Sequence, residues 1–259
     1  MRVAICFFGI TRNLQNQTLR AFETKLFAPC AKLDPHFVRF GHFNLPRQIS
    51  NPRSKERELA LSLDDYRRIG CDESAATPQE EVDEQIDLAS FQKHGDPWGD
   101  GFTSTRNLLR QYYSLEQVTR LLQQSKETFD VVIYSRADVL YRRRLTIPAV
   151  AQGVIYTPGF ARWGGLNDRF ALGDQPAMVK YGLRGKSALE YVETTGRPLH
   201  AEQFLHWYAD QQGLRNQDLD VRFWRVRADG RIAPLDGHLR VLYTVYGYLQ
   251  RFARRHRRP

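Results

Sequence analysis

The stretch from Phe129 to Arg144 reads FDVVIYSRADVLYRRR. Its first six residues, FDVVIY, form a hydrophobic run as long as one strand, which predicts a buried strand of an α/β sheet. A polar turn follows at once and presents the carboxylate of Asp138. In open α/β sheets, ligands bind beyond the carboxyl ends of the strands. The stretch therefore predicts both the class of the fold and the edge of the sheet where a binding site forms.

The N-terminal segment indicates the same fold class. Residues 2–8, RVAICFF, form a short apolar run that is typical of a central strand. Hydrophobic residues then recur near helical spacing over residues 14–28, and residues 36–42, HFVRFGH, are typical of a second strand. A strand, a helix and a strand in this order indicate a parallel sheet with a right-handed crossover. We expect one α/β domain with a mainly parallel central sheet flanked by helices.

Residues 105–125 show the clearest helical pattern in the chain. Their hydrophobic residues fall on one face, and Thr103, Ser104 or Thr105 could cap the first turn. The other expected elements are strands at 153–158, 170–172 and 219–227 and helices at 175–181, 187–194 and 200–212. The last of these strands alternates apolar residues with arginines, as a half-exposed strand does.

Residues 44–104 interrupt the α/β pattern. They contain four prolines, and nine acidic residues lie between Cys71 and Asp100. We interpret this segment as an irregular, partly acidic excursion over the sheet edge, with one helix over residues 55–68. The domain then spans residues 1–245 with this excursion inside it, and a basic, aromatic tail covers residues 246–259.

The composition narrows the class of protein. The chain has 259 residues, of which 42 % are hydrophobic and 26 % are charged, so wholesale disorder, a collagen-like chain and a long coiled coil are excluded. Its three cysteines, without zinc-like spacing, argue against a disulfide framework and a structural zinc site. The sequence has no run of 18 apolar residues and no signal-peptide pattern at its start. We therefore expect a cytoplasmic protein.

The charge is unevenly spread along the chain. The formal net charge is +9, and residues 251–259 carry five arginines and one histidine without an acidic residue. Such a tail suits the phosphates of nucleic acid, anionic lipid or lipid-linked sugars, and it could equally be a solvated tail. The sequence contains no Walker loop, G-x-G-x-x-G, G-x-S-x-G or H-E-x-x-H motif.

Four segments together resemble a known family. Arg136-Ala137-Asp138 follows the strand at 129–134, and it is accompanied by RVAICFFGITRN, GGLNDRFALGD and HAEQFLHWYADQQGL. In this order they resemble the nucleotide-sugar-dependent glycosyltransferases of the glycosyltransferase-A fold, in particular those of bacterial surface-polysaccharide synthesis. In that family a strand delivers a D-x-D motif to a metal on the sugar nucleotide, and many relatives carry R-A-D or R-P-D instead. The resemblance covers most of the chain apart from residues 44–104 and the tail.

The resemblance implies a site built from these segments. The residues implied to bind the nucleotide sugar are Gly9, Arg12, Arg136, Asp138 and Asn167. Asp138 and His238 would hold a divalent metal, Mn²⁺ or Mg²⁺. Catalytic roles fall to Glu202 as general base, because Gln203 replaces the usual aspartate, and to Asp168, which would bind the donor sugar or acceptor hydroxyls.

The same residues have plainer interpretations. Asp138 could cap its turn and pair with Arg142 or Arg143. Asp168 could bond its own backbone, as aspartates in turns do, and Glu202 could merely complement the dipole of a helix. Arg136 could form a surface ion pair that adds little stability, and Arg12 could be a solvated turn residue.

The implied activity is transfer of a sugar from a nucleoside-diphosphate-sugar donor to a hydroxyl of a surface glycan or lipid-linked acceptor. The basic tail would then dock on the anionic inner face of the plasma membrane as a peripheral attachment. Two alternatives stay open. One is a basic nucleic-acid-binding protein, which the acidic segment and the missing recognition signatures make the less favoured interpretation. The other is a catalytically inactive relative of the transferase.

Overall fold

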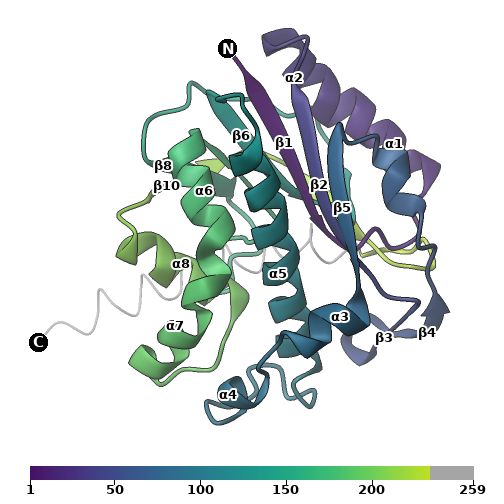
Figure 1. Ribbon diagram of the computed structural model, residues 1–259, viewed down its shortest axis with the longest axis vertical. Helices are drawn as coiled ribbons and strands as arrows, with labels where there is room; N and C mark the ends of the chain where they lie inside the picture. Colours follow the sequence, from purple (N-terminus) through teal and green to yellow (C-terminus); the bar gives the residue numbers. More distant parts are fainter. Residues whose placement is uncertain (234–259) are drawn as a thin grey trace, which may run out of the picture.

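The computed structural model describes residues 1–233 of the chain. Within them, a seven-stranded sheet has the order β10-β8-β9-β6-β1-β2-β5, in which β9 runs against the other six strands (Figure 1). Its strands are β1 (Val3–Gly9), β2 (Val38–Leu45), β5 (Glu73–Pro78), β6 (Val131–Arg136), β8 (Val154–Pro158), β9 (Phe170–Gly173) and β10 (Arg215–Leu219). The expected α/β class, with a mainly parallel sheet flanked by helices, is confirmed. His238 and the tail at 246–259 lie outside the described residues.

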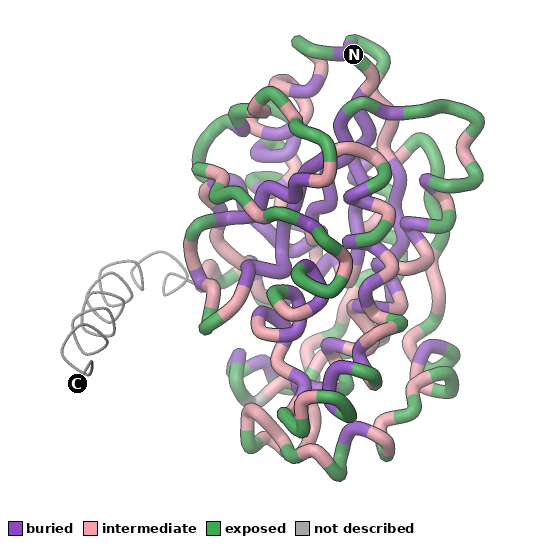
Figure 2. Tube along the Cα trace, turned by 90° about the vertical axis from the view of Figure 1, so that its left-hand side faces the viewer, coloured by how far each residue is buried: buried purple, intermediate pink, exposed green. Residues whose placement is uncertain are grey.

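The sheet is covered on both faces, which explains why its central strands read as continuous apolar runs. Side chains of β1 alternate between two hydrophobic cores, and Figure 2 shows buried chain through the middle of the molecule. One core contains Val3, Ile5, Phe7, Phe22 and Leu26, and the other contains Ala4, Cys6, Phe8, Leu115, Val118 and Leu122. Successive residues of β1 therefore pack against opposite helical layers.

One helical layer is a single winding stretch made of α1 (Asn16–Ala21), the π-helical turn η1 (Phe22–Phe27) and α2 (Ala28–Leu33). It extends five residues beyond the predicted helix at 14–28. Pro29 has no N–H, so it cannot bond the carbonyl of Lys25, which instead accepts the N–H of Leu145 at 2.8 Å. The π-helical turn therefore lies just before the proline that interrupts the regular bonding.

The other layer is led by α5 (Thr103–Gln124), which lies beside α6 (Gln175–Leu183) along the sheet (Figure 1). The helix predicted at 105–125 is confirmed. The remaining helices are α3 (Gln79–Glu84), α4 (Ala89–Gln92), η4 (Arg184–Ser187), α7 (Ala188–Thr195) and α8 (Ala201–Gln211). In the part of the chain that the structure describes, no helix has both the length and the apolar character of a membrane span.

The helix predicted over residues 55–68 is wrong. This segment forms β4 (Glu56–Ala60), which pairs with β3 (Gln48–Asn51) around the short turn η2 (Pro52–Ser54), and a second short turn, η3 (Asp65–Ile69). Lys55 and Glu58 have φ values of 56° and 48°, which no right-handed helix contains. The 44–104 segment also supplies β5, an edge strand parallel to β2, so it is less irregular than expected.

The single strand predicted over 219–227 is also wrong, because the chain changes sheets there. β10 ends at Leu219, and β11 (Phe223–Val226) joins a small antiparallel sheet with β7 (Val139–Tyr141) and β12 (Ile232–Ala233). The N–H of Val226 bonds the carbonyl of Asp138 at 2.9 Å. This return brings the arginines of β11 to the turn that follows β6.

Candidate functional site

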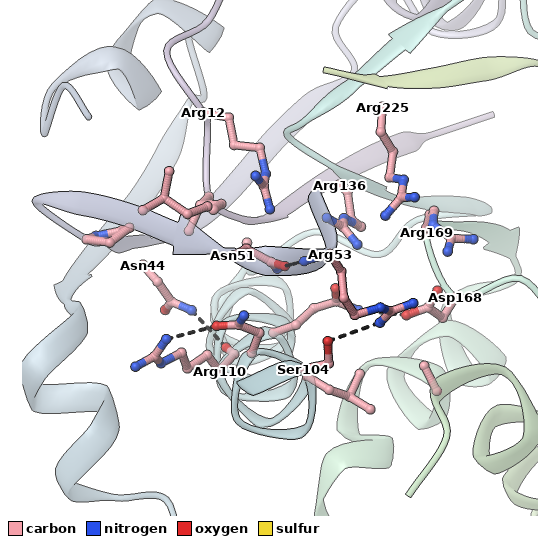
Figure 3. A pocket seen from close by; sticks show the side chains of 18 of the residues that line it. Arg12, Asn44, Asn51, Arg53, Ser104, Arg110, Arg136, Asp168, Arg169 and Arg225 are labelled. Carbon is pink, nitrogen blue, oxygen red and sulfur yellow. Dashed lines mark hydrogen bonds between the residues drawn. The ribbon is translucent and has the colours of Figure 1, made fainter. Parts of the chain in front are cut away.

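A cavity of about 470 Å³ opens at the edge of the sheet where the parallel strands end. Gly9, Asn44 and Arg136 line it from the ends of β1, β2 and β6 (Figure 3). Asp168 enters just before the antiparallel strand β9, and Glu202 enters from the first turn of α8. The edge predicted from the strand at 129–134 is therefore the edge where the cavity lies, as expected for open α/β sheets.

The outer wall comes from the segment that the sequence left irregular. Residues 48–51 and Arg53 line the cavity from β3 and η2. Arg53 donates to the hydroxyl of Ser104 at 3.0 Å, and its guanidinium lies 5.4 Å from the ring centre of Trp98. Trp98 in turn stacks against His200 with 5.4 Å between ring centres. An aromatic pair capped by a guanidinium thus forms one side of the cavity.

Gly9 and Arg12 have backbone conformations that fix the turn after β1. Their φ values are 97° and 50°, in the region that glycine adopts freely and other residues rarely do. The N–H of Gly9 donates to the hydroxyl of Ser114 at 2.8 Å. The turn directs the side chain of Arg12 into the cavity, as Figure 3 shows.

Asp138 lies at the centre of a buried ion network behind the cavity wall. Arg136 donates to its two carboxylate oxygens at 2.8 and 2.6 Å, and Arg12 donates to one of them at 3.1 Å. Arg12 also binds Glu56 at 2.7 and 2.5 Å, and Glu56 accepts the N–H of Ala228 at 2.8 Å. Burial alone would raise the pKa of Asp138, but Arg136 and Arg12 outweigh it and lower the pKa to about 2.

A second pair of carboxylates, Asp168 and Glu202, lines the cavity itself. Glu202 is only 4 % exposed, accepts a hydrogen bond from Arg169 at 3.2 Å, and lies 3.3 Å from Nδ1 of His200. Burial first, and then the neighbouring charge of Asp168, raise the pKa of Glu202 to about 7. For Asp168, Arg169 and Arg136 oppose burial and keep the pKa below its ordinary value. One carboxylate of this pair is therefore ionised and the other can exchange a proton near neutral pH.

Gly165 allows the loop before β9 to approach the start of α8. The N–H of Leu166 bonds the carbonyl of Glu202 at 2.9 Å, and a Cβ on Gly165 would lie 1.8 Å from that carbonyl oxygen. Any larger residue at this position must displace backbone. The close contact fixes Glu202 relative to Asp168, three residues further along the loop.

One of the solved structures that resemble the chain is that of a transferase. Mouse xyloside xylosyltransferase 1, in its apo form, is 14 % identical over 85 % of this chain and 86 % of that chain, with a TM-score of 0.43. This similarity is too loose to assign a fold family or an activity. No family model and no curated protein matches the chain.

The structure brings most of the predicted site residues into one cavity. Those that line it are Gly9, Arg12, Arg136, Asp168 and Glu202. Asp138 lies behind them, and Arg136 and Arg12, rather than Arg142 and Arg143, are the partners of its carboxylate. The roles predicted for these residues stay predictions.

Asn167 is fully buried beside the cavity instead of lining it. Its amide nitrogen donates to the carbonyl of Phe160 at 2.9 Å, and its amide oxygen accepts the N–H of Arg169 at 3.0 Å. Both ends of the side chain therefore hold the loop that positions Asp168, and Asn167 does not line the cavity.

The residues present do not fit a divalent cation at Asp138. Hard cations such as Mg²⁺ need several oxygen ligands, and both oxygens of Asp138 already accept bonds from guanidinium groups. Among residues 1–233, no group of three or more His, Cys, Asp and Glu side chains is arranged to hold a metal. The other proposed ligand, His238, lies outside these residues.

Sequence reasoning missed two arginines as part of the site, Arg225 in β11 and Arg227, which follows its last residue. Both line the cavity beside Arg12 and Arg136. Their period-two spacing within the predicted strand was the available signal. The change of sheet after Leu219 leaves no mark in this local pattern, which predicts a half-exposed strand.

Proposed function

We propose that this protein is a glycosyltransferase that moves a sugar from a nucleoside-diphosphate-sugar donor to an acceptor hydroxyl. The observation that carries the proposal is one cavity that is lined both by an arginine-rich wall and by the Asp168–Glu202 pair. Transfer of a glycosyl group needs these two functions: a cationic site for the departing diphosphate and a base for the incoming hydroxyl. The resemblance of the R-A-D segment to glycosyltransferases supports the same proposal.

The arginines stabilise the leaving group in this mechanism. Negative charge develops on the diphosphate as the glycosidic bond to the donor breaks, and fixed guanidinium groups bind phosphate oxygens through paired hydrogen bonds. The network through Asp138 and Glu56 holds Arg12 and Arg136 in place before the donor arrives. Groups fixed in advance need no reorganisation at the moment of reaction.

Glu202 accepts the acceptor's proton in this mechanism, with inversion at the anomeric carbon. A general base works best when its pKa is close to the working pH, and that of Glu202 is about 7. Asp168 stays ionised beside it and would bind sugar hydroxyls. We therefore place the acceptor beside Glu202.

A nucleotide panel tests the proposal. Thermal unfolding is measured with UDP, GDP, dTDP, CMP and their sugars, and donors that raise Tm are then assayed for release of the nucleotide. A ligand at about 100 times its dissociation constant adds roughly 2.7 kcal/mol to the stability, which is easily seen as a rise in Tm. We expect one nucleotide class to raise Tm and its sugar to be cleaved.

Other outcomes of the panel separate the alternatives. Binding without cleavage of any donor, with or without added glycan acceptors, favours an inactive relative. No shift with any nucleotide, together with steeply salt-dependent binding of mixed DNA or RNA, favours a nucleic-acid-binding protein.

We also propose that the acceptor is a lipid-linked or surface glycan, met at the inner face of the membrane by a cytoplasmic protein. The five arginines of residues 251–259 support this, since each basic residue near an anionic surface contributes roughly 1 kcal/mol. Deleting residues 251–259 is expected to lower binding to anionic liposomes and to leave activity on a soluble acceptor unchanged. Unchanged liposome binding contradicts this part of the proposal.

A further inference from the structure

Arginines dominate the lining of the cavity. Among the residues that the structure describes, seven arginines line it, at positions 12, 53, 110, 136, 169, 225 and 227. Arg12 and Arg136 pair with the buried carboxylates of Glu56 and Asp138, and Arg169 pairs with Glu202. A lining this rich in guanidinium groups favours a bound anion.

Arg225 and Arg227, at the end of β11, lie close to Arg12. Arg227 lies 3.9 Å from Glu56, the carboxylate that already binds Arg12. Burial, followed by the charges of Arg225 and Arg12, lowers the pKa of Arg227 to about 10. Like charges held this close favour a bound anion, which would relieve their mutual repulsion.

Arg12 and Arg136 also keep donors for a ligand. A guanidinium has five N–H groups on three nitrogens. Each of these arginines uses Nε and one Nη on the buried carboxylates, so its second Nη is left to face the cavity. Figure 3 shows Arg12, Arg136 and Arg225 projecting into the same space.

We propose that Arg12, Arg136, Arg225 and Arg227 bind the diphosphate of the donor in place of a divalent cation, so that donor binding needs no metal. The inference rests on the proposed function and names the ligand chemistry of its donor subsite. The diphosphate of a nucleotide sugar carries two negative charges, and its oxygens accept the paired hydrogen bonds that guanidinium groups donate. A divalent cation would instead enter a site that is already positive and would find the oxygens of Asp138 occupied.

Calorimetric titration of the full chain with UDP, GDP and dTDP, in EDTA and in MnCl₂, tests the inference. We expect at least one of these nucleotides to bind, with dissociation constants that agree within about twofold in the two buffers. In EDTA, Arg225→Gln and Arg227→Gln are each expected to weaken that binding at least tenfold, and Arg225→Lys to weaken it less than Arg225→Gln. Arg222→Gln is the matched control, because Arg222 lies in the loop before β11, pairs with Asp220 and does not line the cavity. The dissociation constant of the nucleotide should be the same for this variant as for the wild-type chain.

Three results would overturn the inference. Binding that is lost in EDTA and restored by Mn²⁺ shows that a cation is needed, and it leaves the proposed function standing. Binding that is metal-free but unchanged in both glutamine variants places the diphosphate elsewhere. No binding of any nucleotide in either buffer removes the proposed function together with the inference. Should a glutamine variant fail to fold, the comparison of EDTA with MnCl₂ on the wild-type chain still decides.

Discussion

Asp138 and Glu202 are two deeply buried carboxylates, 2 % and 4 % exposed, one behind the wall of the cavity and one lining it, yet their pKa values are shifted in opposite directions. The pKa of Asp138 is lowered to about 2, and that of Glu202 is raised to about 7. Asp138 has two guanidinium partners, Arg12 and Arg136, whereas Glu202 has Arg169 and a second carboxylate nearby. Burial alone therefore does not decide the protonation of a carboxylate here, because the balance of neighbouring charges does.

This difference divides the cavity by role. A carboxylate that stays ionised down to about pH 2 cannot exchange protons during a reaction at neutral pH, so Asp138 holds arginines in place. A carboxylate with a pKa of about 7 can take up and release a proton under the same conditions, as a general base must. Each experiment below changes one of these two carboxylates or the residues that position it.

The largest expected effect is the loss of turnover when Glu202 is replaced. Glu202→Gln removes the proposed base and should lower kcat by about 10²- to 10⁴-fold with the nucleotide dissociation constant nearly unchanged. Asp210→Asn, an exposed change on the same helix, is the control and should keep wild-type turnover. A Glu202→Gln protein as active as Asp210→Asn would show that Glu202 is not the base.

The next largest effect is the loss of stability when Asp138 is replaced. Asp138→Asn leaves Arg12 and Arg136 buried without their shared carboxylate, so the free energy of unfolding should fall by about 3–5 kcal/mol, measured by urea titration. Asp130→Asn, an exposed change just before β6, should cost less than about 1 kcal/mol. Equal losses in the two variants would mean that the network does not hold the wall of the cavity.

Gly165→Ala changes the position of Glu202 without changing its chemistry. The added Cβ cannot fit against the carbonyl of Glu202, so α8 must shift, with an expected cost of roughly 1–3 kcal/mol and a clear loss of kcat. At Gly159, in the same loop, a Cβ meets only the flexible end of the Asp218 side chain at 3.2 Å, so Gly159→Ala is the milder control. Turnover that survives Gly165→Ala would argue against a precise position for Glu202.

The smallest effect is a pH dependence of stability. The folded state raises the pKa of Glu202, so it binds that proton more tightly than the unfolded chain, and the resulting stability is lost as the pH rises through about 7. Asp168, Arg169 and Arg225 surround the carboxyl group of Glu202. Burial lowers the pKa of His200, so this side chain stays neutral over most of the range from pH 5 to pH 8. The Tm of Glu202→Gln minus that of wild type should therefore increase from pH 5 to pH 8. A constant difference would contradict the raised pKa.

Local sequence patterns predicted the elements whose structure local burial decides. The strands at 2–8 and 129–134 and the helix at 105–125 are confirmed within one or two residues, because strands buried on both faces and one-sided helices have distinct apolar periods. The same logic placed Asp138 at the carboxyl edge of the sheet. The assignment of Asp168 and Glu202 to the site came from the resemblance, and their roles remain to be tested.

Long-range contacts decide the parts that the sequence did not predict. The segment over 55–68 has the composition of a helix, but Glu56 binds Arg12, 44 residues earlier in the chain, and the backbone turns at Lys55 and Glu58 to allow it. The arginines of β11 reach the cavity because Val226 pairs with Asp138, 88 residues earlier in the chain. No local period contains either contact.

The most direct test of the whole account is a crystal structure of the protein with the nucleoside diphosphate identified by the panel, grown in EDTA. The account predicts the diphosphate within about 3 Å of the guanidinium groups of Arg136 and Arg225, with no metal bound, and the open side of the phosphates facing Asp168 and Glu202. A nucleotide bound away from this edge of the sheet, or absent from crystals that contain EDTA, would contradict it.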